Sequence, residues 1–126
     1  MSMRSPLARV RGLGSAKSGT QHFWWQRLTG IALIPLTIWM VVALICVAGA
    51  DFEEARSFVA SPLVAVLLLC LIVALFYHAQ LGMQVVIEDY LHAEGMKLAA
   101  LLAVKFLAVI LGLLSALAVL RIALGS

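Results

Sequence analysis

Three long apolar segments decide what this chain can fold into. They run from about Phe23 to Ala50, from Pro62 to about Ile87, and from about Met96 to Leu120. Each is longer than the roughly 20 apolar residues that a helix needs to cross the hydrocarbon of a bilayer. A lone spanning segment must satisfy its own backbone hydrogen bonds, and the helix does so. The sequence therefore predicts an all-α integral membrane protein with three transmembrane helices.

The composition supports a membrane protein. Of the 126 residues, 64% are hydrophobic and 12% are charged, whereas a soluble domain is about half apolar and a quarter charged. The formal net charge of +3 does not indicate a nucleic-acid partner, because the basic residues gather at the N-terminus, as in membrane proteins. Cys46 and Cys70 lie in apolar segments without metal-binding spacing, so we interpret them as small side chains within the spans.

The charge distribution predicts the orientation. Residues 1–27 contain five basic residues and no acidic ones, namely Arg4, Arg9, Arg11, Lys17 and Arg27. Cytoplasmic segments of membrane proteins are enriched in Lys and Arg, so we expect the N-terminus to be cytoplasmic. This start is short and glycine-rich for a mitochondrial transit peptide, and it lacks the apolar core of a cleaved signal. We therefore expect the inner membrane of a bacterium, with the mitochondrial inner membrane as the alternative.

These signals divide the chain into seven segments. Ser61 and Pro62 resemble the N-cap and first residue of a helix, and Pro35 predicts a kink in the first span. The predicted segments are a cytoplasmic N-terminal segment (1–22), transmembrane helix 1 (23–50), a periplasmic loop (51–61), transmembrane helix 2 (62–87), a cytoplasmic loop (88–95), transmembrane helix 3 (96–120) and a C-terminal tail (121–126).

His78 lies inside the second apolar segment. An ionisable residue within a span is costly and marks a functional site by default. Three interpretations remain open from the residue alone: a hydrogen bond between helices, a haem or metal ligand, or a proton relay. His22 and His92 lie at the membrane edge, so the opposite ligand of a haem at His78 would come from another chain.

Asp89 and Tyr90 follow His78 by eleven and twelve residues, which is about three helical turns. His78 and Asp89 therefore share one helix face, about 16 Å apart along the axis. Gly82, one turn from His78, would leave room for a flat macrocycle. Asp89 and Tyr90 either mark the end of the helix or form a quinone pocket, in which the tyrosine hydroxyl donates a hydrogen bond and the carboxylate connects it to water.

Two further cations lie in or beside the spans. Arg27 opens the first span beside Trp24 and Trp25, and it is either an interfacial anchor or a guanidinium that binds haem propionates. Lys105 lies about two turns into the third span and would extend toward the cytoplasmic surface. We assign no role to Lys105, His22 or His92 from the sequence.

Two stretches together resemble a known family. They are the run from Gly12 to Thr29, which contains His22, two tryptophans and Arg27, and the run His78-Ala79-Gln80-Leu81-Gly82-Met83-Gln84-Val85-Val86-Ile87-Glu88-Asp89-Tyr90. The sequence resembles the smaller hydrophobic membrane anchors of succinate dehydrogenase, respiratory complex II, over nearly its whole length.

This resemblance implies a function for the chain within a complex. It implies a non-catalytic anchor of succinate:ubiquinone oxidoreductase, whose partners are a second anchor of the cytochrome b type, an iron–sulfur subunit and a flavoprotein subunit. It further implies one b haem shared with the cytochrome b-type anchor, whose iron is bound by His78 and whose propionates lie near Arg27. The resemblance places Arg27 near the quinone pocket as well. Ubiquinone would be the substrate at a site that contains Tyr90 and Asp89. The cytochrome b-type anchor would also complete the helical bundle.

Two other classes of function are compatible with parts of the sequence. A purely structural or assembly protein without a redox site would not need the alignment of His78 with Asp89 and Tyr90. A small proton-conducting subunit could use His78 as a relay, but three spans without inverted repeats argue against a transporter. The type of quinone and the haem potential do not follow from the sequence.

Overall fold

The computed structural model describes the backbone of residues 6–125 and the side chains of residues 20–125. Its helices are α1 (Pro6–Val47), α2 (Phe52–Ala60), α3 (Pro62–Tyr90) and α4 (Glu94–Ala123), and no strand occurs between residues 6 and 125. Three stretches are long and apolar enough to span a membrane, namely Thr20–Val47, Pro62–Tyr90 and Glu94–Ala123. The all-α, three-span prediction is confirmed.

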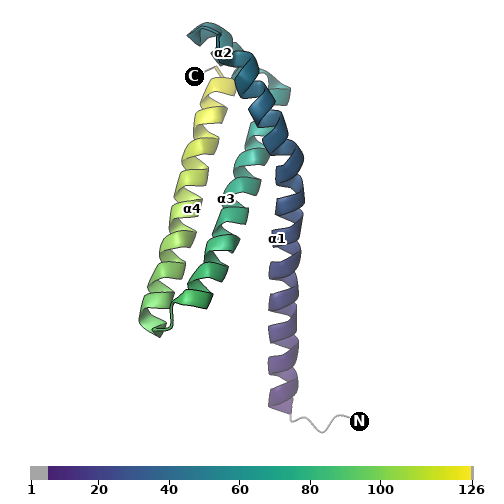
Figure 1. Ribbon diagram of the computed structural model, residues 1–126, viewed down its shortest axis with the longest axis vertical. Helices are drawn as coiled ribbons and strands as arrows, with labels where there is room; N and C mark the ends of the chain where they lie inside the picture. Colours follow the sequence, from purple (N-terminus) through teal and green to yellow (C-terminus); the bar gives the residue numbers. More distant parts are fainter. Residues whose placement is uncertain (1–5, 126) are drawn as a thin grey trace.

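The ends of the helices alternate between two sides (Figure 1). The amino-terminal end of α1 and the α3–α4 connection lie at one end of the molecule, whereas α2 and the carboxyl end of α4 lie at the other. This is the placement that three antiparallel crossings require. The charges of Arg4, Arg9, Arg11 and Lys17, on which the predicted cytoplasmic side depends, lie outside the described side chains.

The segment predicted as the first loop, 51–61, contains the short helix α2. Asp51 caps it, because its carboxylate accepts a hydrogen bond from the Glu54 backbone N–H at 2.9 Å, and the Asp51 backbone N–H reaches the Glu54 carboxylate at 3.4 Å. Such a capping box satisfies two otherwise unpaired backbone donors. Ser61 then ends α2 and precedes Pro62, the first residue of α3, but its side chain makes no capping hydrogen bond.

The second connection is shorter than the sequence suggested. We expected residues 88–95 to form a loop, but α3 continues to Tyr90 and α4 begins at Glu94, so only residues 91–93 join them. Asp89 and Tyr90 therefore belong to the last helical turn. Apolar periodicity ends at Ile87, which is why the sequence placed the boundary there, whereas the backbone hydrogen-bond ladder continues to the N–H of Leu91.

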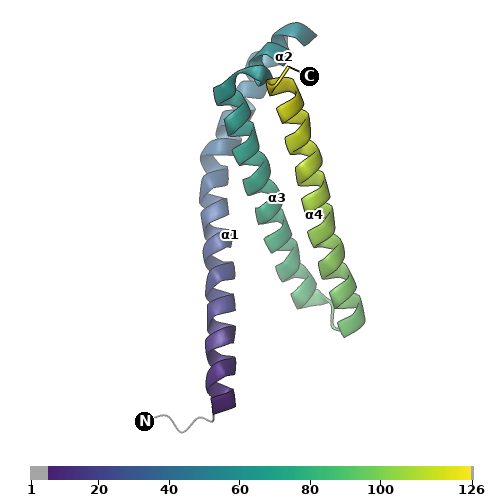
Figure 2. The same cartoon turned by 180° about the vertical axis from the view of Figure 1, so that it is seen from behind.

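Helix α3 is the central element, because it packs against both α1 and α4 (Figures 1 and 2). The buried apolar residues of the described chain lie on α1 and α3: Ala43, Val64, Ala65, Ala74, Leu81 and Ile87. None of the residues of α4 is buried. Most of the apolar surface of the three helices is thus left for lipid or for other chains.

Helix α1 runs through Pro35 without interruption. Proline removes the hydrogen bond to the carbonyl four residues earlier and favours a bend. Figures 1 and 2 show the carboxyl-terminal part of α1 leaning toward α3, while its amino-terminal part diverges from α3. The two helices therefore separate toward the end of the molecule at which Tyr90 lies.

The topology can be tested by chemical labelling. In a chain carrying Cys46→Ala and Cys70→Ala, Ser57→Cys in α2 should react with an impermeant maleimide from the outside of intact spheroplasts. Ala93→Cys, between α3 and α4, should react only after permeabilisation, because one crossing separates the two positions. Labelling of both positions from the same side would contradict the three-span arrangement, and exchanged sides would contradict the orientation.

Candidate functional site

His78 lies in the middle part of α3 and contacts α1. Its Nδ1 is 3.1 Å from the Thr29 hydroxyl oxygen, which makes a hydrogen bond between two spans. The Thr29 hydroxyl is also 2.7 Å from the backbone carbonyl of Trp25 and 3.2 Å from that of Gln26. Thr29 is the one buried polar residue among the described side chains, with 9% of its surface exposed.

These distances assign the tautomer of His78. A threonine hydroxyl has one hydrogen to donate and two lone pairs. Because the Trp25 carbonyl is the closest acceptor, the hydroxyl donates to it in the usual manner of a threonine within a helix. The hydroxyl oxygen then accepts from Nδ1–H of His78, so the imidazole proton lies on Nδ1 and the lone pair on Nε2. Hydrogen-bond geometry, rather than an observed proton, supports this assignment.

Gly30 lets the imidazole approach α1. A Cβ atom at this position would lie 3.4 Å from Cε1 and 3.9 Å from Nδ1 of His78. The distance to Cε1 is shorter than most contacts that Cβ atoms make in proteins. Gly82, which we expected to leave room for a flat macrocycle, has no atom within 4 Å of its ideal Cβ position, so the space beside it is open in the described chain. The glycine in contact with the imidazole lies on the neighbouring helix.

An open groove borders this hydrogen bond, and we name it the His78 groove. Its volume is about 490 Å³, and it is lined by Phe23, Gln26, Arg27, Gly30, Ile31, Ile34 and His78. The Arg27 guanidinium lies over the Phe23 ring at 4.9 Å from the ring centroid, a cation–π contact. Two of the four predicted site residues, His78 and Arg27, therefore share one groove with an apolar wall.

Nε2 of His78 remains available to a ligand. Among the described side chains, the buried nitrogen or oxygen atom that lacks a partner is Nε2 of His22, not that of His78. No hydrogen bond engages Nε2 of His78 within residues 20–125. The imidazole thus presents an unprotonated nitrogen, which is the form that binds a metal ion.

Asp89 and Tyr90 lie apart from this groove. Both are exposed, Tyr90 to 77% of its surface, and neither lines the His78 groove. They stay on the helix of His78, so the predicted separation of about 16 Å along the axis holds. They lie where α1 and α3 diverge (Figure 2). The described chain therefore does not bring Tyr90 and Arg27 into one pocket.

The remaining histidines lie elsewhere. His22 is two turns from Thr29 on α1 and is half-buried, whereas His92 is exposed in the connection between α3 and α4. Residues 20–125 contain no group of three side chains that could hold a metal ion by themselves. An iron bound at His78 would therefore need ligands from outside this part of the chain.

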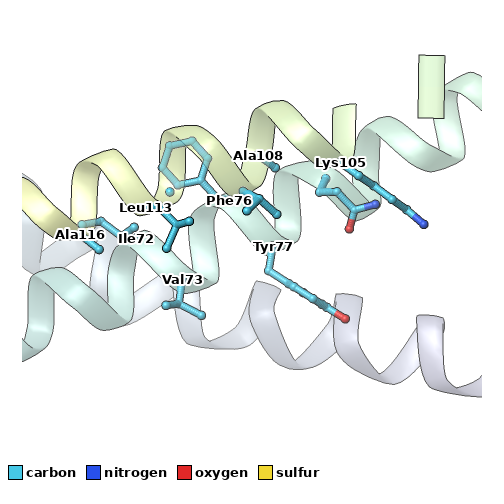
Figure 3. A pocket seen from close by; sticks show the side chains of 11 residues that line it. Ile72, Val73, Phe76, Tyr77, Lys105, Ala108, Leu113 and Ala116 are labelled. Carbon is cyan, nitrogen blue, oxygen red and sulfur yellow. The ribbon is translucent and has the colours of Figure 1, made fainter. Parts of the chain in front are cut away.

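A second groove runs between α3 and α4 (Figure 3), and we name it the Lys105 groove. Its volume is also about 490 Å³, and its lining includes Tyr77, Gln80 and Lys105 at its polar end. The Tyr77 ring meets the Trp25 ring edge-on at 5.8 Å between centroids. The Gln80 amide donates to Gln84 at 3.2 Å, which in turn donates to Glu88 at 3.1 Å.

Thr29 and Gly30 are the residues of the site that sequence reasoning missed. Their position in the sequence was a hint, because Thr29 is two residues after the candidate Arg27 and the small residue Gly30 follows it. Neither residue is ionisable, however, and no periodicity shows which turn of α1 lies opposite His78. Only the packing of α1 on α3 identifies them.

The fold and the groove define the class of protein. It is a three-span membrane chain in which one histidine, oriented by a neighbouring helix, faces an open groove beside an arginine. Within the described side chains this groove stays open beside the histidine.

Known sequences identify the family. The family described as "Succinate dehydrogenase/Fumarate reductase transmembrane subunit" matches residues 1–112. A succinate dehydrogenase hydrophobic membrane anchor subunit of Rickettsia bellii is 32% identical over 107 residues, covering 85% of this chain and 86% of that protein. The corresponding anchor of Paracoccus denitrificans is 30% identical over 102 residues, covering 81% and 79%. The chain belongs to this family, and the resemblance to its membrane anchors is confirmed.

A relative from outside the bacteria agrees with this result. A succinate dehydrogenase membrane anchor subunit of Porphyra purpurea is 31% identical over 105 residues, which cover 83% of this chain and 85% of that protein. The similarity therefore extends over most of the length of each of these anchors.

Thr29→Val tests the hydrogen bond between the helices. Valine keeps the shape of threonine but accepts no hydrogen bond, so the free energy of unfolding should fall by about 1 kcal/mol, the scale of such bonds in membranes. The Tm of the purified complex should fall accordingly. Thr29→Ser keeps the hydroxyl and is the matched control. Equal Tm values for the valine variant and the natural chain would show that the bond does not stabilise the helix pair.

Proposed function

We propose that this chain is the smaller hydrophobic anchor of a succinate:ubiquinone oxidoreductase, and that with a cytochrome b-type anchor it holds a b haem and forms the ubiquinone site. The observation that carries the haem proposal is the hydrogen bond between His78 and Thr29, which engages Nδ1 and leaves Nε2 of the neutral imidazole free for a ligand. Family membership supports the anchor role.

The residues of the His78 groove fit a haem. Haem iron in proteins commonly takes a histidine nitrogen as an axial ligand, and a ligand histidine usually donates its other N–H to an oxygen that fixes the ring. Thr29 supplies that oxygen. Bound here, haem b would supply a one-electron redox centre. His78 would hold the iron, and the apolar wall of Ile31 and Ile34 would exclude water from it.

Arg27 would bind the haem propionates. It lines the groove of His78, and its guanidinium can donate paired hydrogen bonds to a carboxylate. Its contact with the Phe23 ring would hold it in place. Because Arg27 lies with His78 and away from Tyr90, we favour the propionates over the quinone as its partner.

A further ligand to the iron would come from the cytochrome b-type anchor. His22 lies about 10 Å from Thr29 along α1, from seven residues at 1.5 Å each, and His92 is at the far end of α3. Both are too distant along the axis to reach the same iron. The largely exposed faces of α1, α3 and α4 leave ample surface against which a second anchor would lie.

Tyr90 and Asp89 would form this chain's part of the ubiquinone site. The Tyr90 hydroxyl would donate a hydrogen bond to a quinone carbonyl, and the neighbouring carboxylate would connect it to water, from which quinone reduction takes its protons. The exposure of both side chains at the end of α3 supports this role. The chain is not catalytic by itself, because succinate oxidation would belong to the flavoprotein and electron delivery to the iron–sulfur subunit.

The charge distribution supports the proposed membrane and orientation. The basic, acid-free N-terminal segment favours a cytoplasmic N-terminus in a bacterial inner membrane. The flavoprotein and the iron–sulfur protein would then dock at the end of the molecule that contains the α3–α4 connection, the same end as Tyr90. Electrons and protons would thus reach the quinone from one side.

His78→Ala should remove the haem. The purified complex should lose the b-type bands of its reduced-minus-oxidised spectrum, because one axial ligand is gone. His92→Ala, which changes an exposed histidine outside the groove, should retain them. An unchanged haem content in the His78 variant would refute the ligand assignment.

A second variant tests the haem site even if His78→Ala prevents the complex from assembling. Thr29→Val leaves the His78 imidazole in place and removes only its hydrogen-bond partner. Loss of the hydrogen bond to Nδ1 should weaken haem binding by about 10- to 100-fold, the usual effect of removing such a bond, and raise the midpoint potential, because a less basic imidazole stabilises ferric iron less. No change in retention or potential would refute the role of Thr29.

Tyr90→Phe should impair quinone reduction. Without the hydroxyl, turnover with ubiquinone should fall by roughly 100-fold, the lower end of the contribution of a positioned proton donor. Succinate oxidation with an artificial acceptor should be unchanged. Tyr77→Phe is the matched control, since Tyr77 lies within the span and outside this site. Full ubiquinone turnover in the Tyr90 variant would remove Tyr90 from the pocket.

A further inference from the structure

Lys105 is a charged residue that the proposed function does not use. It lies eleven residues after Glu94, where α4 begins, which is about 16 Å into the helix at 1.5 Å per residue. A lysine at this depth is costly and rarely stands without a partner. Its position therefore requires an explanation of its own.

No carboxylate of the described side chains lines the Lys105 groove. The other polar residues of its lining are Tyr77 and Gln80, which are uncharged. The nearest carboxylate along this part of α3 is that of Glu88, which is exposed near the helix end and already accepts a hydrogen bond from Gln84. Within the described side chains, Lys105 thus leaves an uncompensated positive charge at one end of the groove.

The rest of the groove is apolar. Ile72, Val73 and Phe76 of α3 face Val109 and Leu113 of α4 across it. Gly112 of α4 also lines the groove, and a Cβ atom at this position would lie 3.7 Å from the Phe76 ring, an ordinary van der Waals contact. The Lys105 groove is therefore apolar apart from the cation at one end and its two uncharged polar neighbours.

The direction of the Lys105 side chain agrees with a groove that is apolar along its length and charged at one end. In Figure 3, Lys105 extends along the groove away from Leu113 and Ala116, toward the Glu94 end of α4. Lysine side chains in membranes bend in this way to bring the ammonium group to the headgroup level. The ammonium would therefore meet the headgroups of the leaflet at the Tyr90 end, while the apolar part of the groove extends toward the middle of the bilayer.

We propose that the Lys105 groove binds an anionic phospholipid, whose phosphate pairs with Lys105 and whose acyl chain lies along Ile72, Val73 and Leu113. A phospholipid combines a negative headgroup with an apolar chain, and it approaches the groove in the direction that the lysine takes. Basic pockets between transmembrane helices select anionic headgroups in this way. The proposal does not depend on the haem or the quinone.

The experiment uses the purified complex in detergent with dioleoyl phosphatidylglycerol as the probe and phosphatidylcholine as the neutral comparison. Native mass spectrometry measures the bound lipid, and the Tm measures its effect. The natural complex should retain phosphatidylglycerol and gain Tm when it is added. Lys105→Met should bind it at least tenfold more weakly and gain no Tm, while its haem spectrum and ubiquinone turnover stay unchanged.

Three further variants sharpen the result. Lys105→Arg keeps the charge and should retain the lipid. Lys97→Met removes another lysine of α4 outside the groove and should behave as the natural chain does. Ala108→Phe fills the groove but keeps the charge, and it should also weaken binding.

The proposal would be overturned by any of three results. The first is equal retention of phosphatidylglycerol by Lys105→Met and the natural complex, and the second is equal stabilisation of the natural complex by phosphatidylcholine. The third is loss of a partner chain from Lys105→Met together with no effect of phosphatidylglycerol on the natural complex, which would assign the lysine to a carboxylate on that partner.

Discussion

The hydrogen bond between His78 and Thr29 joins the two helices that carry the candidate site. Among the described residues it is the side-chain hydrogen bond that connects two spans. It places the imidazole against Gly30, fixes the proton on Nδ1 and brings Arg27 into the same groove. In a bilayer, helices associate through close packing and through polar contacts such as this one, so the hydrogen bond and the contact of the imidazole with Gly30 together favour this pairing of α1 and α3.

The same packing leaves the chain incomplete. Helix α3 contacts both neighbours, yet α4 has no buried residue and the His78 groove is open. Under the proposed function, the open groove would be this chain's share of a haem site, and the other apolar faces would meet lipid or other chains. The two grooves lie on different helix pairs, so cofactor binding and lipid binding would use separate surfaces of α3.

Parts of the candidate site were predictable from the sequence. His78 stood out because an ionisable residue in a span is costly, and Asp89 and Tyr90 followed from helical geometry along one element. The helix ends were less accessible, since Glu88, Asp89 and Tyr90 are polar and look like a loop, although their backbone remains helical. Gly82 drew attention because it shares a helix with His78. The glycine beside the imidazole is Gly30, which lies 48 positions before His78 in the chain.

The sequence by itself determined the number of spans, their approximate extents and the alternation of the two connections between the ends of the molecule. The extents depend on apolar length, which is local, and the alternation follows because each span carries the chain from one side to the other. Only the tertiary structure decided that Thr29 and Gly30 meet His78, that Arg27 shares the groove, and that Tyr90 stands apart. The physical reason is that the axial register of two antiparallel helices is set by side-chain contacts between them, and neither helix contains that register in its own periodicity.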